Sequence, residues 1–202
     1  MFANGKSYLT LIERCLIAAA LVLVASNAGA QRYAVQGGCR DGVPHGAWQL
    51  TDANGRLRVL GAFNRGKRTG SFIHWNASGV RIAHMPYEED ARKGTLALWY
   101  QTPLRGQDAP QRLEAVYAAG QLNGLVRIWN TDGRVRGEYL YAAGQIIGAK
   151  AWDTGGRELP DAQSLAQAVK DVDVHEAYHA TLEALVARHR PACEPGAPPK
   201  RG

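Results

Sequence analysis

The residues with the clearest potential for chemistry are His175, Glu176 and His179, in the segment His-Glu-Ala-Tyr-His. On a helix, the pattern H-E-x-x-H places two imidazoles on one face, where they can bind zinc, with the glutamate beside them as general base. A zinc hydrolase also needs a third ligand and a cleft, and only 23 residues follow His179. No metal site is therefore predicted, and a small zinc-dependent hydrolase is kept as an alternative function.

Glu176 also has a structural explanation. Asp173, followed three residues later by Glu176, matches a capping box, which is expected if the helix breaks within residues 170–173. The chain carries no G-x-S-x-G motif, P-loop or dinucleotide fingerprint. The protein is therefore predicted to be non-enzymatic and to use no cofactor.

The motif lies in a segment with helical composition. Residues 161–190 are rich in Ala, Leu, Gln and Glu and lack Gly and Pro, and Pro191 ends the segment. We expect residues 159–191 to form a helical cap over the apolar side or an open end of the preceding domain. Residues 192–202 are predicted to be a disordered tail. The apolar residues on or near one stripe of the helix are Leu165, Val169, Val172, Leu182 and Val186.

The chain before the helix repeats with a period of 24 residues. Glycines mark the period, and six inserted residues interrupt it once. Four of the five units contain an Asp/Asn-x-x-Gly turn or a close variant of it, and periods of this length indicate a repeat architecture. The marking glycines are Gly46, Gly70, Gly94, Gly124 and Gly148.

The turns between units are too short for a crossover helix, so the strands must be sequential and antiparallel. The predicted fold class is mainly β: an elongated antiparallel β-meander of 24-residue hairpin repeats over residues 31–158, with a C-terminal α-helical cap. Residues 33–35 are a further edge-strand candidate. The nine predicted strands are 47–51, 56–63, 71–75, 80–87, 95–100, 112–117, 125–129, 135–141 and 149–152.

The repeated marks are Gly-x-(Phe/Trp), an aromatic residue about five positions in, Asn/Asp-x-x-Gly, and Tyr/Phe-x-x-Gly-x-x-x-Gly. This pattern resembles the MORN-type repeat, and more closely its bacterial variant in YwqK-family antitoxin-like proteins. The resemblance covers roughly residues 42–156 and is clearest at 70–87 and 124–148. The third unit departs from it through an insertion at residues 101–111. The resemblance implies a twisted antiparallel sheet used for protein or lipid contact, without catalytic residues.

Residues 1–30 have the pattern of a secretory signal peptide. Lys6 and Arg14 precede a ten-residue apolar run, and Ala28-Gly29-Ala30 supplies a small-x-small cleavage signal before Gln31. The run is too short for a membrane span, which needs about 20 residues. The protein is therefore predicted to be exported, with a periplasmic location. In such an oxidising compartment, the remaining Cys39 and Cys193 are predicted to form a disulfide.

Cleavage would leave a net charge of +5, with the basic excess in residues 31–158. No Lys/Arg block is long enough to indicate nucleic acid, and a mild positive field favours an acidic protein or an anionic envelope component. The predicted function is an exported binding module, with an antitoxin- or immunity-like protein as an alternative, and open sheet ends favour a homodimer. The predicted binding surface, or alternatively the sheet-to-helix core, consists of Trp75, Trp99, Trp129, Tyr87, Tyr117 and Tyr141.

Overall fold

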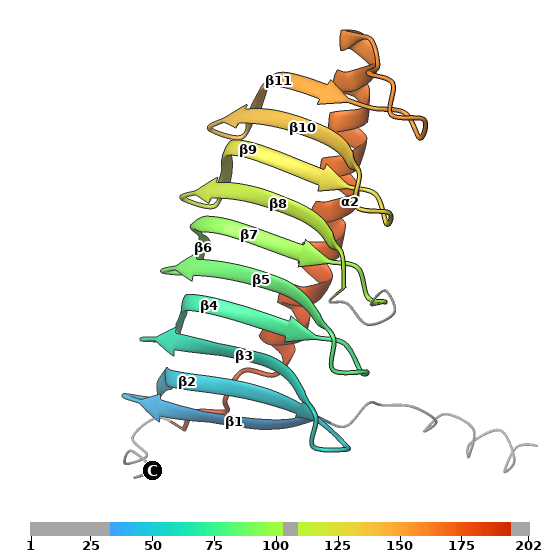
Figure 1. Cartoon of the computed structure of the whole chain (residues 1–202). Coiled ribbons are helices and arrows are strands. Elements are labelled where there is room, and N and C mark those ends of the chain that lie inside the picture. Colours follow the sequence, from blue (N-terminus) through green and yellow to red (C-terminus); the bar gives the residue numbers. More distant parts are fainter. Residues whose placement is uncertain (1–32, 103–108, 195–202) are drawn as a thin grey trace, which may run out of the picture. The chain divides into compact units, whose positions relative to one another are not determined.

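The computed structural model describes residues 33–102 and 109–194 and confirms the mainly β fold. Eleven antiparallel strands form one open sheet, and helix α2 (Asp161–Arg188) lies on one face of it, behind the strands in Figure 1. The predicted signal peptide, the centre of the insertion and the last eight residues of the predicted tail lie outside the described residues. No helix within the described ranges is long and apolar enough to cross a membrane.

The strand order follows the sequence, as expected for a meander, except that the short β6 pairs only with β5. All nine predicted strands are present, and the candidate at residues 33–35 is the start of a full strand, β1. The strands are β1 (Tyr33–Arg40), β2 (Val43–Asp52), β3 (Leu57–Asn64), β4 (Lys67–Trp75), β5 (Arg81–Glu88), β6 (Ala91–Arg92), β7 (Gly94–Trp99), β8 (Gln111–Ala118), β9 (Gln121–Trp129), β10 (Val135–Ala142) and β11 (Gln145–Ala151).

One kind of turn recurs between the strands. At the β4–β5 connection, Asn76 Oδ1 accepts hydrogen bonds from the backbone N–H of Ser78 at 2.9 Å and of Val80 at 3.0 Å. Gly79 closes the turn with a φ of 82°, a conformation that suits glycine. Asp52 and Asp153 make the same pair of bonds in their own turns. The repeated Asx-x-x-Gly motif therefore acts as the local signal for the hairpins that contain it.

A β-bulge lies near the start of the second strand in four hairpins: β2–β3, β4–β5, β7–β8 and β9–β10. At every bulge, one residue of the second strand is skipped in the pairing with the first strand. The skipped residues occupy the same place in each repeat, and three of the four are arginines: Arg58, Ile82, Arg112 and Arg136. Two of these arginines reach α2, because Arg112 lies 5.2 Å from the centre of the Tyr178 ring and Arg136 Nη2 lies 2.7 Å from Asp171 Oδ1.

The length of α2 matches the width of the sheet that it crosses. Near its first turn, Ser164 Oγ accepts a hydrogen bond from Ala151 N–H in β11 at 3.2 Å. Beyond its other end, His189 O accepts one from Trp48 Nε1 in β2 at 3.1 Å. The helical rise between Ser164 and His189 is about 38 Å, and the eight strand spacings from β2 to β11 also amount to about 38 Å. One 24-residue repeat, which contributes two strands, therefore corresponds to about six helical residues.

The core lies between α2 and the sheet face that it covers, here called the helix face. Trp48, Phe63, Phe72 and Tyr87 form a chain of ring contacts with centroids 5.4–6.1 Å apart. The predicted Cys39–Cys193 disulfide is formed and joins β1 to the segment after α2. Because its half-cystines are 154 residues apart, the chain-entropy model gives a stabilisation of about 4–5 kcal/mol.

Two expectations about the helix are wrong. α2 does not break at residues 170–173, so Asp173 lies within a continuous helix and is not the N-cap of a capping box. Leu182 and Val186 are buried as expected, but Leu165 and Val169 are 48 % and 50 % exposed. Polar residues take their place, and the sheet forms hydrogen bonds with two of them, Ser164 and Asp171. The buried stripe consists of Ser164, Ala168, Asp171, His175, His179, Leu182 and Val186.

Candidate functional site

The histidines of the H-E-x-x-H segment lie between α2 and the sheet. The side chains of His175 and His179 are 5 % and 1 % exposed, respectively. Among the described residues, His175 Nδ1 and His179 Nε2 have no hydrogen-bond partner. No group of three or more His, Cys, Asp or Glu side chains in the described ranges could hold a metal ion. The segment therefore does not present two accessible imidazoles to a cleft, as a catalytic zinc site requires.

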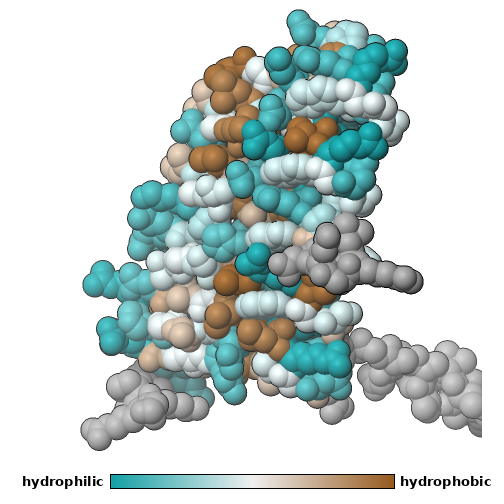
Figure 2. All heavy atoms as spheres, viewed as in Figure 1, coloured by the Kyte–Doolittle hydropathy of each residue, from teal (hydrophilic) through white to brown (hydrophobic). Residues whose placement is uncertain are grey.

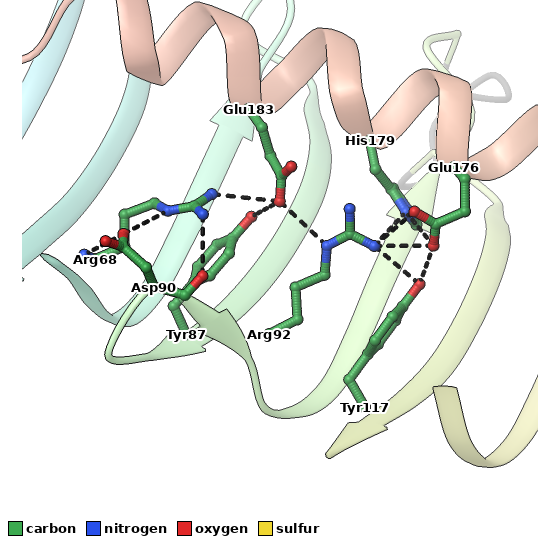
Figure 3. Close-up of polar contacts among 8 residues, drawn as sticks. All are labelled: Arg68, Tyr87, Asp90, Arg92, Tyr117, Glu176, His179 and Glu183. Atoms are coloured by element: carbon green, nitrogen blue, oxygen red, sulfur yellow. Dashed lines mark hydrogen bonds and ion pairs between the residues drawn. The ribbon is translucent and has the colours of Figure 1, made fainter. Parts of the chain in front are cut away.

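Glu176, the candidate general base, is held by the sheet (Figure 3). Arg92 Nη1 lies 2.8 Å from both carboxylate oxygens of Glu176, and the Tyr117 hydroxyl donates to Oε1 at 2.5 Å. The same arginine reaches Glu183, one heptad further along α2, through Nε at 3.1 Å. The Tyr87 hydroxyl also donates to Glu183 Oε1, at 2.7 Å. One arginine and two tyrosines of the sheet thus bind two carboxylates on the side of α2 that faces the sheet.

The electrostatics of this cluster favour charged, fully bonded carboxylates. Burial opposes ionisation of Glu176, but hydrogen bonds from His179, Tyr117 and Arg92 outweigh it and lower its pKa to about 2. Burial likewise opposes ionisation of Glu183, and Arg92 and Tyr87 lower its pKa nevertheless. A general base works best with a pKa near the operating pH. These glutamates are therefore suited to anchoring the helix and poorly suited to proton transfer.

A second arginine extends the cluster. Arg68 donates from its backbone N–H and from Nε to Asp90 Oδ1 at 2.8 and 3.0 Å, and its Nη1 lies 3.3 Å from Glu183 Oε1. Its guanidinium also lies 4.0 Å from the centre of the Tyr87 ring. Asp90 stands where other repeats have glycine and has a φ of 70°. The carboxylate that accepts these bonds explains why an aspartate replaces glycine at that place.

The first half of α2 is anchored by a different acidic residue. The buried Asp171 accepts a hydrogen bond from the Tyr139 hydroxyl at 2.7 Å and one from Gln167 Nε2 at 2.8 Å. The bulge residue Arg136 completes its ion pair. The polar groups of α2 that face the sheet are thus largely neutralised by strand residues, and the helix face offers little free charge to a ligand.

The structure divides the six predicted aromatic residues between the two faces of the sheet. Tyr87, Tyr117 and Tyr141 lie on the helix face and are only 4–5 % exposed. The expectation that these tyrosines line an accessible surface is wrong, and their alternative role in the sheet-to-helix core is the one observed. Side chains alternate along a strand, so each residue points to the same face as the residues two positions before and after it.

The three tryptophans lie on the opposite face, here called the open face. In β4, Phe72 and His74 are buried beneath α2, so the alternate residue Trp75 points to the other side and is half-buried. Trp99 and Trp129 occupy the same place in later repeats and are also half-buried. Because each lies two strands from the next, the three indoles form a column with a spacing of about 10 Å.

Arginines accompany this column, and the sequence predicted a row of aromatic and arginine side chains without naming any individual arginine. The Arg81 guanidinium lies 4.1 Å from the centre of the Trp99 ring, and Arg127 lies 5.9 Å from that of Trp129. In the strand register, Arg81 is also the direct partner of Trp75. Neither arginine recurs at the same place in the other repeats, so no repeated signal in the sequence identifies them. We call these five residues, Trp75, Arg81, Trp99, Arg127 and Trp129, the Trp–Arg column.

The open face carries both polar and apolar residues. Figure 2 shows hydrophilic side chains over much of it, with apolar residues near the β9–β11 end and also over the lower strands. No protein-family model matches the chain, and no curated protein matches it. The two faces of the sheet are therefore the basis for a functional proposal.

Proposed function

We propose that this protein is an exported, non-enzymatic repeat protein that binds a protein partner through the open face. The observation that carries the proposal is the Trp–Arg column on the face that α2 leaves uncovered. Tryptophan and arginine are the residue types most enriched at energetic hot spots of protein interfaces. Indoles held on adjacent hairpins also lose little conformational entropy when a partner binds.

Charge and location support the same proposal. The positive net charge of the chain favours a partner with an acidic surface. The N-terminal pattern of residues 1–30 and the Cys39–Cys193 disulfide favour export to an oxidising compartment. The resemblance to MORN-type repeats is consistent with a contact role, and an antitoxin- or immunity-like protein would use the same face. The hydrolase alternative lacks support, because Arg92 and Tyr117 occupy the carboxylate of Glu176.

Site-specific photo-crosslinking in the native host tests this proposal. A benzophenone amino acid replaces Trp75 on the open face or, as a control, Ala177 on the exposed side of α2. We expect a discrete protein adduct from position 75 only, and its loss when Arg81→Ala and Trp99→Ala are added. The same adduct from position 177, or none from position 75, would contradict a protein-binding open face. Trp99-dependent cosedimentation with anionic lipid vesicles without any protein adduct would identify an anionic envelope component instead.

A further inference from the structure

The β11 end of the sheet gathers exposed apolar side chains. Ile147 is 62 % exposed, and the neighbouring Leu140 and Leu125, which face each other across β10 and β9, are 45 % and 38 % exposed. Leu165, in the first turns of α2, adds a fourth side chain at 48 %. Figure 2 shows this gathering on the open face near β9–β11. Contiguous apolar patches of this kind mark interaction sites more often than scattered exposed residues do.

These side chains line a groove of about 650 Å³. Gly148 contributes to its depth, because it has no side chain above Leu140, whose Cβ lies 3.7 Å from the place a Gly148 Cβ would take. Charged residues of both signs, Glu138, Lys150 and Asp161, also line the groove. The groove therefore combines an apolar floor with a rim that carries two carboxylates and one ammonium group.

The same end exposes an unpaired strand edge. β11 pairs with β10, and no strand of the described residues pairs with its other edge. The returning chain covers only its last residue, through a hydrogen bond from Leu159 N–H to Ala151 O at 2.8 Å. Natural sheets protect such edges with charges, prolines or bulges. Here the protection is limited to Lys150 and to the bulge at Ile147.

We infer that a second copy of this chain docks on the β11 end, related to the first by a two-fold axis. In this dimer, Ile147 of each copy fills the groove of the other. A two-fold interface requires a surface that is complementary to itself. The rim meets this condition, because Lys150 of one copy can approach Asp161 or Glu138 of the other, whereas a rim of one sign would repel itself. The free edge of β11 is also complementary to itself, since it presents both backbone N–H donors and C=O acceptors.

Sedimentation equilibrium of residues 31–202, which contain the whole compact unit from Tyr33 onward, tests the dimer. We expect a concentration-dependent dimer, and Ile147→Glu should weaken its association by about tenfold or more by placing a charge in the groove. Val174→Glu is the matched control, because Val174 is 53 % exposed on α2 and lies outside the groove. A monomeric parent chain, or equal effects of the two substitutions, would overturn the inference.

Disulfide trapping tests the symmetry independently. Cys39 and Cys193 are joined to each other, so Ile147→Cys introduces the sole free thiol of residues 31–202. Mild oxidation should join two Ile147→Cys chains into a covalent dimer, because the dimer already holds the two thiols together. The Val174→Cys variant should remain monomeric under the same oxidation. Assemblies larger than a dimer in the parent chain would show pairing between different edges and would exclude a closed two-fold interface.

Discussion

The two faces of the sheet are built from the same repeat but use aromatic residues differently. On the helix face, Tyr87 and Tyr117 are buried, and their hydroxyls are bonded to glutamates of α2. On the open face, Trp99 and Trp129 lie half-buried beneath arginines of the sheet itself. The difference teaches that residue type and spacing alone do not separate a structural aromatic from one available to a partner. Whether an aromatic residue is available depends on the face to which its side chain points and on whether α2 covers that face.

The arginines show the same contrast. Arg92 bridges two helix carboxylates at 2.8 and 3.1 Å, and its pKa is raised by Glu183 and Glu176 despite the opposing effect of burial. Arg81, on the open face, stacks on an indole. The first arrangement stabilises the fold, and the second leaves a cation at an accessible aromatic surface.

The largest expected contrast is between two tryptophans. Trp48→Ala on the helix face should lower the free energy of unfolding by about 3–5 kcal/mol, because Trp48 is fully buried and contacts Phe63 and Phe72. Trp99→Ala on the open face should cost about 1 kcal/mol and abolish the crosslink to the partner. Urea unfolding measures both changes. Equal losses of stability would show that the open face is also a core.

Two arginines provide the next test. Arg92→Ala should cost about 2 kcal/mol, since it leaves the partly buried Glu176 without its ion pair, whereas Glu183 keeps Arg68. Arg81→Ala removes a surface contact to Trp99 and should cost less than about 1 kcal/mol. Chemical unfolding of the two variants, with the double variant Arg92→Ala/Glu176→Ala as a control for the unpaired charge, makes the comparison. If Arg92→Ala were neutral, the cluster would not anchor α2.

Histidines on the two faces should differ in their effect on pH-dependent stability. Burial lowers the pKa of His74 to about 4, so the folded state stays unprotonated while the unfolded state, with a pKa near 6.5, binds a proton. The unprotonated His74 makes its full contribution to the free energy of unfolding above pH 6.5. This contribution falls by up to about 3 kcal/mol as the pH drops towards 4.

His74→Leu should therefore flatten the pH dependence of unfolding between these pH values. Leucine suits the place, because Leu50 and Leu98 occupy it in neighbouring repeats, and the change removes an unbonded Nδ1. His84→Leu on the open face, where His84 bonds Ser71 at 2.8 Å, should change the slope less. The test is to measure the free energy of unfolding of both variants across this pH range. If His74→Leu left the pH dependence of that free energy unchanged, His74 would be excluded as the titrating group.

The smallest contrast concerns single hydroxyl groups. Tyr117→Phe removes the hydrogen bond to the Glu176 carboxylate and should cost about 1–2 kcal/mol. Ser71→Ala removes the bond to His84 on the open face and should cost no more than about 0.5 kcal/mol. Thermal unfolding of the two variants resolves the difference. A larger loss for Ser71→Ala would reverse the ranking of the faces.

The sequence by itself determined the architecture of this protein. The Asx-x-x-Gly turns specify every second hairpin locally outside the insertion, because side-chain bonds to the turn amides and a glycine at positive φ close them without help from distant residues. Short connections then leave only a sequential antiparallel order. The helix boundaries follow from Pro160 and Pro191, and the pairing of Cys39 with Cys193 follows from their being the two cysteines outside residues 1–30.

The tertiary structure alone decided what the two faces do. Bulges shift the alternation of side chains by one residue, so the sequence pattern could not assign Trp75 and Tyr87 to opposite faces. The buried stripe of α2 was missed for a related reason. His179 and Asp171 are buried although they are polar, because Tyr117, Tyr139 and Arg136 from strands far away in the sequence face them. Contacts of that kind depend on how helix and sheet are stacked, and no local pattern in the sequence encodes them.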